Sequence, residues 1–262
     1  MIRRIKIATY NVNSIRMRLG IVLDWLAKNK ADILCMQETK TEDSKFPMME
    51  FEEAGYHSIF NGQKGYNGVA IASREKPTDV IKGLPDRHEP DQARLIAAKI
   101  MGINIINTYV PQGREMDTPY FNYKLEWLER LRKFFDEQYS PRKKIIWCGD
   151  LNIAPEDIDV HDPKGLKGHV DFNDIMTQIF HDFIDWGFVD IFRKHKPEGG
   201  HFTYFDFRVR GTVERNVGWR VDHILATKPL AKKSVDSYID MKPRLVEKPS
   251  DHTPLVAEFE IS

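Results

Sequence analysis

Polar residues that could carry out chemistry stand beside apolar, strand-like segments at six places in the chain. They are carboxylates, amides, one tyrosine and one histidine: Asn11, Glu38, Tyr109, Asp150, Asn152, Asp222, Asp251 and His252. In α/β sheets, ligands gather where strand ends meet loops. A carboxylate at the end of an apolar strand is costly to bury unless it has a partner or a metal. Six segments that offer such groups therefore indicate a functional site, and stability alone explains them poorly.

These residue types suit the metal-assisted hydrolysis of a phosphodiester bond. Carboxylate oxygens, in place of thiolates or histidine clusters, favour Mg²⁺, which keeps several waters and takes one or two carboxylates together with a substrate phosphate. Such a metal polarises a phosphoryl oxygen and helps water to attack. The amides of Asn11 and Asn152 can position that water, or metal-bound waters, without adding charge.

The histidine and the acids near it have separable roles. A protonated His252 can stabilise negative charge that develops on the phosphate. Asp222, on a different segment, can orient the other ring nitrogen and hold the charge. Asp251 adjoins His252 in the sequence and is badly placed to orient that ring, so we expect it to reach the metal or the loop backbone.

Each of these signals is weak on its own. A strand-end acid such as Glu38 is more often a helix cap or a surface group than a ligand. The GDLN sequence at residues 149–152 favours a turn, and the SDH sequence at 250–252 is compatible with an Asx-turn. The prediction of a site rests on their order and number taken together.

The elements that must position these side chains are mostly strands. Runs rich in Ile, Val and aromatic residues, bounded by Gly, Pro or Asn, predict strands at residues 5–12, 32–38, 68–73, 93–100, 103–110, 144–152, 201–207, 220–227, 234–241 and 255–261. The connection within residues 98–104 is typical of a tight hairpin.

Helical periodicity appears between the strands. Three apolar stripes predict helices that face the core: Leu19, Val22, Leu23 and Leu26; Leu125, Leu128, Leu131, Phe134 and Phe135; Ile175, Ile179, Phe183 and Trp186. Strands and helices alternate through both halves without a linker or a repeat. We therefore expect one α/β domain over residues 1–262, with two packed sheets and helices outside.

The composition narrows the class of protein. The 262 residues are 41% hydrophobic and 30% charged, an ordinary composition for a chain with its own core. Both cysteines, Cys35 and Cys148, lie in apolar runs, so we interpret them as buried thiols in a reducing compartment. The chain has no signal-peptide pattern and no segment of membrane-spanning length. We expect a cytoplasmic protein, associated with the nucleoid if its source is prokaryotic.

The charged residues are unevenly distributed, although 39 basic and 39 acidic residues give a formal net charge of +0. Residues 193–233 contain ten Lys or Arg and four Asp or Glu. A basic face can bind phosphates while an acidic pocket elsewhere holds a metal. The alternative is that these charges are merely solvated.

The same segments resemble the exonuclease III family of apurinic/apyrimidinic (AP) endonucleases, within the endonuclease/exonuclease/phosphatase superfamily. The matching segments run from Lys6 to Phe259 in the family's order: KIATYNVNSIR, DILCMQETK, GYNGVAI, NTYVPQG, CGDLNIAPEDIDV, ERNVGWRVDHILA and EKPSDHTPLVAEF. The most specific are GDLNIAPEDIDV and the pair WRVDHIL and PSDHTP. The resemblance implies a four-layered α/β sandwich, in which two packed mixed β-sheets are flanked by helices.

The resemblance also implies a metal site. Glu38 would be the main ligand, with Asn11 and Asp251 nearby, and the metal would be Mg²⁺, for which Mn²⁺ could substitute. Asn13 stands where some relatives have an acid, which weakens the case for a second tightly held metal.

Five further residues would act on the substrate phosphate if the resemblance holds. Asp150 would activate or orient the attacking water, with help from Asn152. Tyr109 would contact the scissile phosphate. His252, oriented by Asp222, would stabilise the transition state.

Substrate selection would come from a small apolar pocket. By the resemblance, Tyr204, Trp219 and Val221 form walls that admit a flipped sugar without a base. Family members commonly have Phe or Trp at the position of Tyr204, and the added hydroxyl puts strict abasic selectivity in question. Phe205 and Phe207, close by in the sequence, are expected to pack in the core.

Basic residues lie among these aromatic residues, a combination that suits contact with a DNA backbone. The candidates for substrate binding are Arg208, Arg215 and Asn216. We expect the partner to be double-stranded DNA with abasic sites or 3′ ends, bound by a monomer. Resemblance to exonuclease III around PSDHTP and YFDFR favours both endonuclease and 3′→5′ exonuclease activity, with 3′-end cleaning.

Two other functions remain open. The first is a hydrolase of the same superfamily that acts on RNA, inositol phosphates or lipids, which the segment ERNVGWRVD disfavours. The second is an inactive DNA-binding module. The presence of every strand-end acid and of the histidine argues against that reading.

Overall fold

The computed structural model describes residues 3–86 and 92–261, and the strands within these ranges form two six-stranded sheets. The first sheet has the order β11-β12-β1-β2-β4-β3 and the second β5-β6-β7-β8-β10-β9. Neighbouring strands are antiparallel except for one parallel pair in each sheet, β1 with β2 and β7 with β8. The strands are β1 (Arg3–Asn11), β2 (Ile33–Gln37), β3 (His57–Asn61), β4 (Val69–Ser73), β5 (Thr78–Lys82), β6 (Leu95–Ile100), β7 (Ile103–Tyr109), β8 (Ile145–Asp150), β9 (Phe188–Asp190), β10 (Asp222–Thr227), β11 (Ser234–Ile239) and β12 (Leu255–Ile261).

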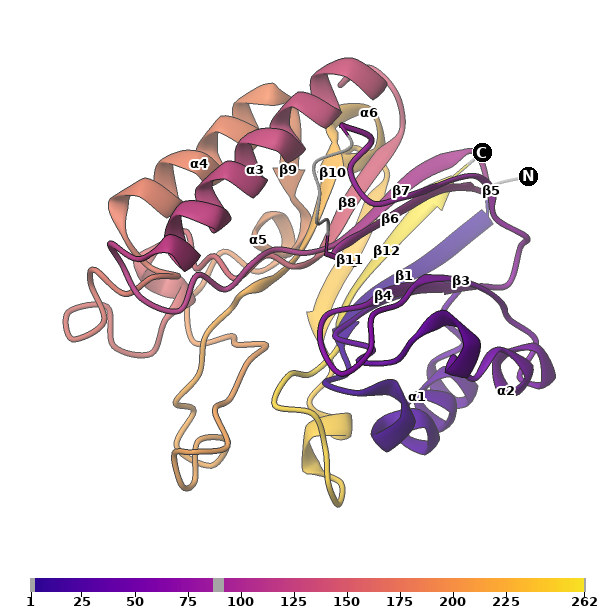
Figure 1. Cartoon of the computed structure of the whole chain (residues 1–262), viewed down its shortest axis with the longest axis horizontal. Helices are drawn as coiled ribbons and strands as arrows, with labels where there is room; N and C mark the ends of the chain where they lie inside the picture. The colour runs from indigo at the N-terminus through magenta and orange to yellow at the C-terminus, as the bar shows by residue number, and fades with distance from the viewer. Residues whose placement is uncertain (1–2, 87–91, 262) are drawn as a thin grey trace.

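Helices cover the outer faces of both sheets (Figure 1). Two lie on the first sheet, α1 (Ile15–Asn29) and α2 (Met48–Glu53), and two long ones lie on the second, α3 (Pro119–Gln138) and α4 (Asp174–Trp186). The short helices α5 (Ile191–His195) and α6 (Lys228–Ala231) flank β9 and β10. The arrangement confirms the predicted four-layered α/β sandwich. In the described residues, no helix has the length and apolarity needed to cross a membrane.

The strands alternate their side chains between two buried faces. In β1, Ile5 and Ile7 point to the interior between the sheets, whereas Tyr10 points to α1 and α2. Both faces are covered, so the central strands read as almost continuous apolar runs. Cys35 and Cys148 lie in the interior between the sheets as free, buried thiols, which agrees with their interpretation from the sequence.

The two parallel pairs bring the candidate functional residues to one edge of the sandwich. Tyr109 at the end of β7 pairs with Asp150 at the end of β8, and Asp222 at the start of β10 pairs with Asp150 from the other side. Asn11 ends β1 at the corresponding edge of the first sheet, beside the end of β2. The site therefore forms where the ends of both central strand pairs meet.

Local sequence explains the main turns and helix ends. The β6–β7 hairpin turns at Met101 and Gly102, which both have positive φ (52° and 73°), as a tight two-residue turn requires, and this confirms the predicted hairpin. Helix α3 begins after Thr118, whose hydroxyl accepts a hydrogen bond from the Phe121 amide, with Pro119 in the first turn.

Three expectations about the elements were wrong. Residues 201–207 are not a strand, because their backbone makes only isolated bridges and loop hydrogen bonds. Ile175 is 45% exposed, since α4 buries the face that carries Met176, Phe180 and Phe183. The ten expected strands did not include β3, β5 and β9: β3 and β5 are edge strands, half-buried and mostly exposed respectively, and β9 has only three residues.

Candidate active site

A cavity of about 580 Å³ opens at the edge where the strand ends meet, and we call it the active-site cavity. It is mostly polar and collects side chains from both sheets and from the loops that follow them. Its lining residues are Glu38, Tyr109, Gln112, Arg114, Asp150, Asn152, His169, Asp171, Tyr204, Asp206, Arg208, Trp219, Val221, Asp251 and His252.

Asn11 links the two sheets at the base of this cavity. Its side-chain Nδ2 donates to Glu38 Oε1 at 2.8 Å and to Asp150 Oδ2 at 2.9 Å, so one amide spans from β2 to β8. Its backbone carbonyl accepts a hydrogen bond from Ser250 Oγ at 2.7 Å, which ties in the loop that carries His252. Asn11 therefore fixes two carboxylates relative to each other without adding charge.

The turn after β2 holds Glu38 in an unusual backbone conformation. Glu38 and Lys40 both have positive φ, 49° and 51°, in the left-handed region that non-glycine residues rarely adopt. Lys40 Nζ lies 2.7 Å from Glu38 Oε2 and donates to Asn13 Oδ1 at 2.6 Å. Asn13 Nδ2 in turn donates to Asp251 Oδ1 at 3.0 Å. A lysine ammonium and an amide thus hold two of the candidate metal ligands.

Asp222, His252 and Asp150 form a buried line of polar groups. Asp222 Oδ2 accepts a hydrogen bond from His252 Nδ1 at 2.7 Å, and His252 Nε2 lies 3.7 Å from Asp150 Oδ2. The expected orientation of His252 by Asp222 is thereby present. Burial alone would lower the pKa of His252, but Asp222 and Asp150 outweigh it and raise the pKa to about 10, so the ring is a cation at neutral pH.

Asp150 occupies the centre of the site and is 1% exposed. Burial raises the pKa of this carboxyl above its ordinary value; the charge of His252 acts in the opposite direction, and Asp222 adds to the rise. Its Oδ1 accepts a hydrogen bond from the Asn152 backbone amide at 3.0 Å. Asp150 is therefore a fixed carboxylate with an unusually high affinity for a proton.

Tyr109 presents a phenol to the same cavity. Burial raises its pKa well above 10, and the negative charges of Glu38 and Asp150 raise it further, so the hydroxyl keeps its proton and remains a donor. Arg94 stacks over the Tyr109 ring with its guanidinium carbon 4.8 Å from the ring centroid and donates to the Tyr109 carbonyl at 3.1 Å. These contacts hold the ring at the end of β7.

A fully buried lysine, which was not predicted from the sequence, holds the loops that line the cavity. Lys124 on α3 donates to the carbonyl of Asn152 at 2.7 Å and to Asp171 Oδ1 at 2.8 Å, with longer bonds to the carbonyls of Gln112 and Val170 at 3.3 Å. It joins three loops that line the cavity. A sequence signal was present, because Lys124 falls at helical spacing within the apolar stripe of α3.

Other lining residues had no usable sequence signal. Arg114, His169, Asp171 and Asp206 come from loops without periodicity, and their side chains reach the cavity only through the course of the backbone. His169 packs against Trp219 with ring centroids 4.7 Å apart. These contacts depend on tertiary structure, so sequence pattern alone could not predict them.

The donor set suits a divalent cation. Ligand atoms of Asp150, Asp222 and His252 lie within 4.8 Å of one another, but Asp222 and His252 already share a 2.7 Å hydrogen bond, which ties up that pair. Glu38 and Asp251 are hard carboxylates at the cavity, with Asn11 bridging to a third at Asp150. Such oxygen donors fit a hard divalent metal better than a soft one.

The expected substrate wall lies beside the buried line of Asp222, His252 and Asp150. Tyr204, Trp219 and Val221, which we call the recognition wall, all line the active-site cavity. The Tyr204 ring packs against His252 with centroids 4.9 Å apart. Arg208 also lines the cavity, where its side chain is 86% exposed and paired with Asp206 at 2.7 Å.

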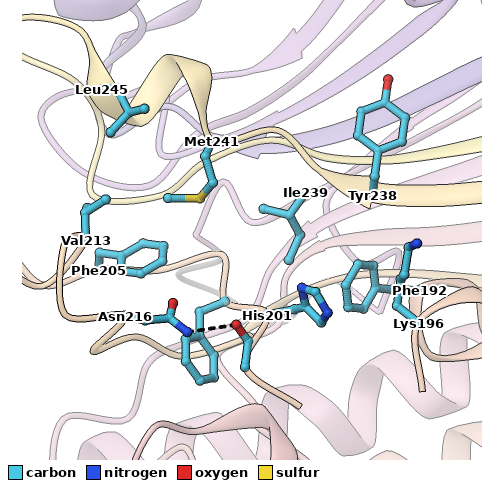
Figure 2. Close-up of a pocket in the computed structure, with 12 residues that line it drawn as sticks. Phe192, Lys196, His201, Phe205, Val213, Asn216, Tyr238, Ile239, Met241 and Leu245 are labelled. Carbon is cyan, nitrogen blue, oxygen red and sulfur yellow. Dashed lines mark hydrogen bonds between the residues drawn. The ribbon is translucent and has the colours of Figure 1, made fainter. Parts of the chain in front are cut away.

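The remaining expectations for the substrate side are only partly met. Asn216 donates from Nδ2 to the Gly200 carbonyl at 2.9 Å and lines a separate, mainly apolar cavity of about 450 Å³ (Figure 2). Arg215 bonds to the Arg210 carbonyl at 3.2 Å and does not line the active-site cavity. Phe205 is buried as expected, but Phe207 is 48% exposed, so the prediction that it packs in the core was wrong.

Comparison with known proteins gives matches over nearly the whole chain. A protein-family model described as the endonuclease/exonuclease/phosphatase family matches residues 8–252. An exodeoxyribonuclease III from Haemophilus influenzae is 33% identical over 97% of this chain and 99% of its own length.

Solved structures agree with this placement. The structure of an AP endonuclease from Archaeoglobus fulgidus superposes with a TM-score of 0.95 and 55% identity, over 98% of this chain and 100% of that one. A 3′ phosphatase from Neisseria, bound to a product DNA hairpin, superposes with a TM-score of 0.94 and 40% identity, over 98% of this chain and 100% of that one. The chain therefore belongs to the endonuclease/exonuclease/phosphatase family, among the exodeoxyribonuclease III and AP endonuclease enzymes.

Proposed function

We propose that this enzyme is a Mg²⁺-dependent DNA repair nuclease that hydrolyses the phosphodiester 5′ to abasic sites in duplex DNA. The observation that carries the proposal is the line of Asp222, His252 and Asp150, joined through Asn11 to Glu38, in one cavity with the recognition wall. The relatives named as exodeoxyribonuclease III and AP endonuclease support the same substrate and reaction.

The metal would be held by Glu38, with Asn11 and Asp251 beside it, and Mn²⁺ would substitute for Mg²⁺. When bound, it would neutralise charge on the phosphate and polarise a phosphoryl oxygen. Lys40 contacts Glu38 and Asn13 contacts Asp251, and these contacts would hold the two acids in position for a metal.

The protein groups would divide the chemistry between attack and charge stabilisation. Asp150, whose Oδ1 accepts a hydrogen bond from the Asn152 amide, would accept a proton from the attacking water. Asn152 would help to orient that water. His252 would donate its Nε2 proton toward a phosphoryl oxygen, while Asp222 holds the ring through Nδ1. Tyr109 would donate a hydrogen bond from its phenolic hydroxyl to the same phosphate.

The recognition wall would select the abasic nucleotide. Walls of Tyr204, Trp219 and Val221 leave room for a sugar without a base, and a normal nucleotide would meet the aromatic rings. The exposed Arg208 would contact the backbone of the flanking DNA, and Arg215 would reach it further along the same loop. We further propose that the enzyme acts as a monomer on DNA in the cytoplasm.

The test is incubation with a duplex that holds one abasic analogue, with Mg²⁺ or with EDTA, beside a blunt undamaged duplex. We expect a single metal-dependent nick 5′ to the analogue, and slower 3′→5′ shortening of the blunt duplex. Absence of a metal-dependent nick would remove the proposed endonuclease activity.

Asp150→Asn provides the matching variant. We expect it to lose nearly all cleavage, by about 10²–10⁴-fold in kcat, while it keeps DNA affinity in a binding assay. Retained turnover would exclude Asp150 from the proposed role.

A second activity, removal of phosphate from 3′ ends, is favoured by the similarity to the Neisseria 3′ phosphatase. The same phosphoryl chemistry would serve it, because only the position of the phosphate along the strand differs. Release of inorganic phosphate from a 3′-phosphorylated duplex measures this activity directly.

A further inference from the structure

An arginine lies fully buried behind the recognition wall. Arg220 is 0% exposed and donates from Nε to Asp159 Oδ1 at 2.6 Å, from a terminal nitrogen to Asp159 Oδ2 at 3.1 Å, and from the other to Asp190 Oδ2 at 2.8 Å. The same guanidinium donates to His223 Nδ1 at 3.0 Å, so this ring nitrogen accepts, and Nε2 donates to the Ile153 carbonyl at 2.8 Å.

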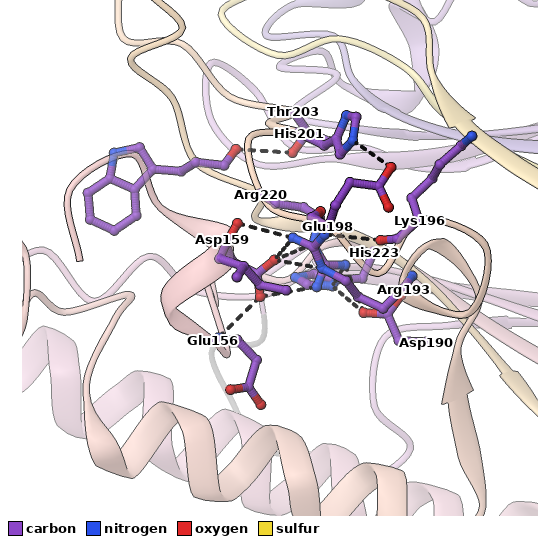
Figure 3. Close-up of polar contacts among 12 residues, drawn as sticks. Glu156, Asp159, Asp190, Arg193, Lys196, Glu198, His201, Thr203, Arg220 and His223 are labelled. Carbon is purple, nitrogen blue, oxygen red and sulfur yellow. Dashed lines mark hydrogen bonds and ion pairs between the residues drawn. The ribbon is translucent and has the colours of Figure 1, made fainter.

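A second arginine completes this group. Arg193 contacts Asp159 and donates to the carbonyl of Ile158 at 3.2 Å and to that of Glu198 at 2.6 Å. We call Asp159, Asp190, Arg193, Arg220 and His223 the buried ion cluster (Figure 3). Burial alone would raise the pKa of both aspartates, but Arg220 holds each pKa below its ordinary value, so two anions face two cations.

The buried ion cluster and the recognition wall lie on opposite sides of the segment at residues 219–221. Trp219 and Val221 line the active-site cavity, whereas Arg220 between them points to Asp159 and Asp190. Alternate residues of an extended backbone point to opposite sides. The position of Arg220 therefore sets the position of both neighbouring walls.

Backbone contacts carry this connection through to the catalytic histidine. Isolated bridges join Val160 to Trp219, Trp219 to Tyr204, and Tyr204 to His252. The Arg220 amide donates to the Asp159 carbonyl at 2.8 Å, so the first bridge starts at the cluster itself. A displacement at Asp159 or Arg220 would be passed across the wall to the loop that holds His252.

Stability alone is a poor explanation for such a cluster. Well-packed apolar residues in place of a buried ion pair are often neutral or stabilising, because desolvation offsets the attraction between the charges. Directional, bidentate hydrogen bonds from a rigid guanidinium instead fix geometry. The positions of Trp219 and Val221 are the geometry that this guanidinium fixes.

We propose that Arg220, held by Asp159 and Asp190, is a positioning residue that sets the selectivity of the recognition wall for an abasic nucleotide. This inference rests on the proposed function. Without the cluster, the wall would move or become heterogeneous, and a nucleotide that carries a base would be rejected less well. A pocket contact of this kind changes discrimination by about 10–200-fold.

The experiment compares Arg220→Met and Arg220→Lys with the wild-type enzyme and with Leu131→Ala. Leu131 lies on the buried face of α3, in a different hydrophobic cluster from Trp219, so its truncation destabilises the fold without loosening the wall. Asp159→Asn serves as a second route to the same loss if Arg220→Met does not fold.

Two measurements are made on each variant. The first is selectivity, the ratio of incision rates at one abasic analogue and at undamaged positions in closed circular duplex DNA. The second is the ¹⁹F NMR spectrum of protein labelled with 5-fluorotryptophan, in which Trp219 is assigned by its loss in Trp219→Phe. The spectrum requires no activity, so it tests the positioning role even if the proposed function fails.

In Arg220→Met, or in Asp159→Asn, we expect selectivity to fall by about tenfold or more and the Trp219 resonance to shift or broaden. Arg220→Lys keeps the charge but loses the fork that spans two aspartates, and we expect an intermediate loss. Leu131→Ala should keep both readouts near wild type despite a lower unfolding midpoint. Unchanged selectivity with an unchanged Trp219 resonance in the cluster variants would overturn the inference, as would an equal loss in Leu131→Ala.

Discussion

Replacement of Lys124 by methionine tests whether the buried ammonium holds the loops of the active-site cavity. Methionine nearly matches the length of lysine, so the change removes charge and donors and leaves little empty space. Four acceptors lose the lysine donor: the Asp171 carboxylate and the carbonyls of Gln112, Asn152 and Val170. Asp171 keeps a hydrogen bond from Gln112 Nε2 at 3.0 Å, and the Val170 carbonyl keeps one from Asn173 Nδ2 at 3.3 Å.

The magnitude follows from which acceptors are left without a partner. Removal of one member of a buried ion pair costs about 3–5 kcal/mol, because the remaining charge stays buried. The carbonyls of Gln112 and Asn152 would add about 1–3 kcal/mol each if neither found water. Asp171 and Gln112 border the active-site cavity, where water can enter, so we expect the total to stay near about 3–5 kcal/mol of the free energy of unfolding.

The assay is urea unfolding followed by circular dichroism, with extrapolation to water and a check that the slope is unchanged. Lys133→Met is the matched control, since Lys133 lies on the same helix with a 70% exposed side chain and a weak contact to Glu137 at 3.7 Å. We expect the control to change stability by less than about 0.5 kcal/mol.

A double variant separates the pair from the general effect of the substitution. Asp171→Asn in the Lys124→Met background removes the stranded charge, and we expect it to recover part of the loss. A loss below about 1 kcal/mol in Lys124→Met alone, or no recovery in the double variant, would refute the reasoning about the buried charge.

Three further outcomes are expected. Gly149→Ala should lower stability by on the order of 3 kcal/mol in thermal unfolding, because φ is 143° and a Cβ would lie 1.9 Å from the Thr108 carbonyl oxygen; a fold as stable as wild type would contradict this. Asp222→Asn should reduce kcat by about 10²–10⁴-fold at unchanged DNA affinity, because the 2.7 Å bond that holds His252 loses its charge, and steady-state kinetics with a binding assay measure both. In the buried ion cluster, the pKa values of Asp159 and Asp190 are lowered in the folded protein. The stability that these carboxylates contribute is therefore present above about pH 4, and it is lost as the pH falls through their folded-state pKa values. Asp159→Asn should therefore flatten the acid limb of stability against pH between about pH 5 and 2, and a limb as steep as that of wild type would count against this.

The candidate catalytic residues could be picked out in the sequence because each stands beside its own apolar run. Asp150 is the last of the six buried residues of β8, and Asn11 ends β1, whose last five residues are buried. Parallel pairing of β7 with β8 brings Tyr109 beside Asp150, which agrees with the expectation that strand ends gather the functional groups. Local periodicity and topology were enough for this part of the site.

The rest of the site depends on contacts that the sequence does not show locally. Phe205 and Phe207 have the same residue type two positions apart, yet one is 2% and the other 48% exposed, because residues 201–207 bond to Trp219 and Asp251 and not to a sheet. In the sequence, nothing distinguishes Arg220 from the other basic residues of its segment. Its burial depends on two aspartates, Asp159 and Asp190, which are far away in the sequence. Sequence spacing predicts which face a residue takes within an element, but not which loop will meet it.

The place of β12 between β11 and β1 has a consequence for the order in which the protein can fold. The first sheet joins residues about 250 positions apart, since Arg3 pairs with Ile261. Closure of so long a loop is entropically costly and slow compared with local hairpins. β11 is connected to β1 only through β12, so during synthesis it cannot join this sheet until β12 emerges. His252 lies just before β12 and reaches the site at the same stage. The half of the protein around β7 and β8 can form early, whereas the active-site cavity is complete only when the loop that carries His252 has been synthesised. Pulse-labelled hydrogen exchange should therefore detect protection in β7 and β8 before β1 and β12.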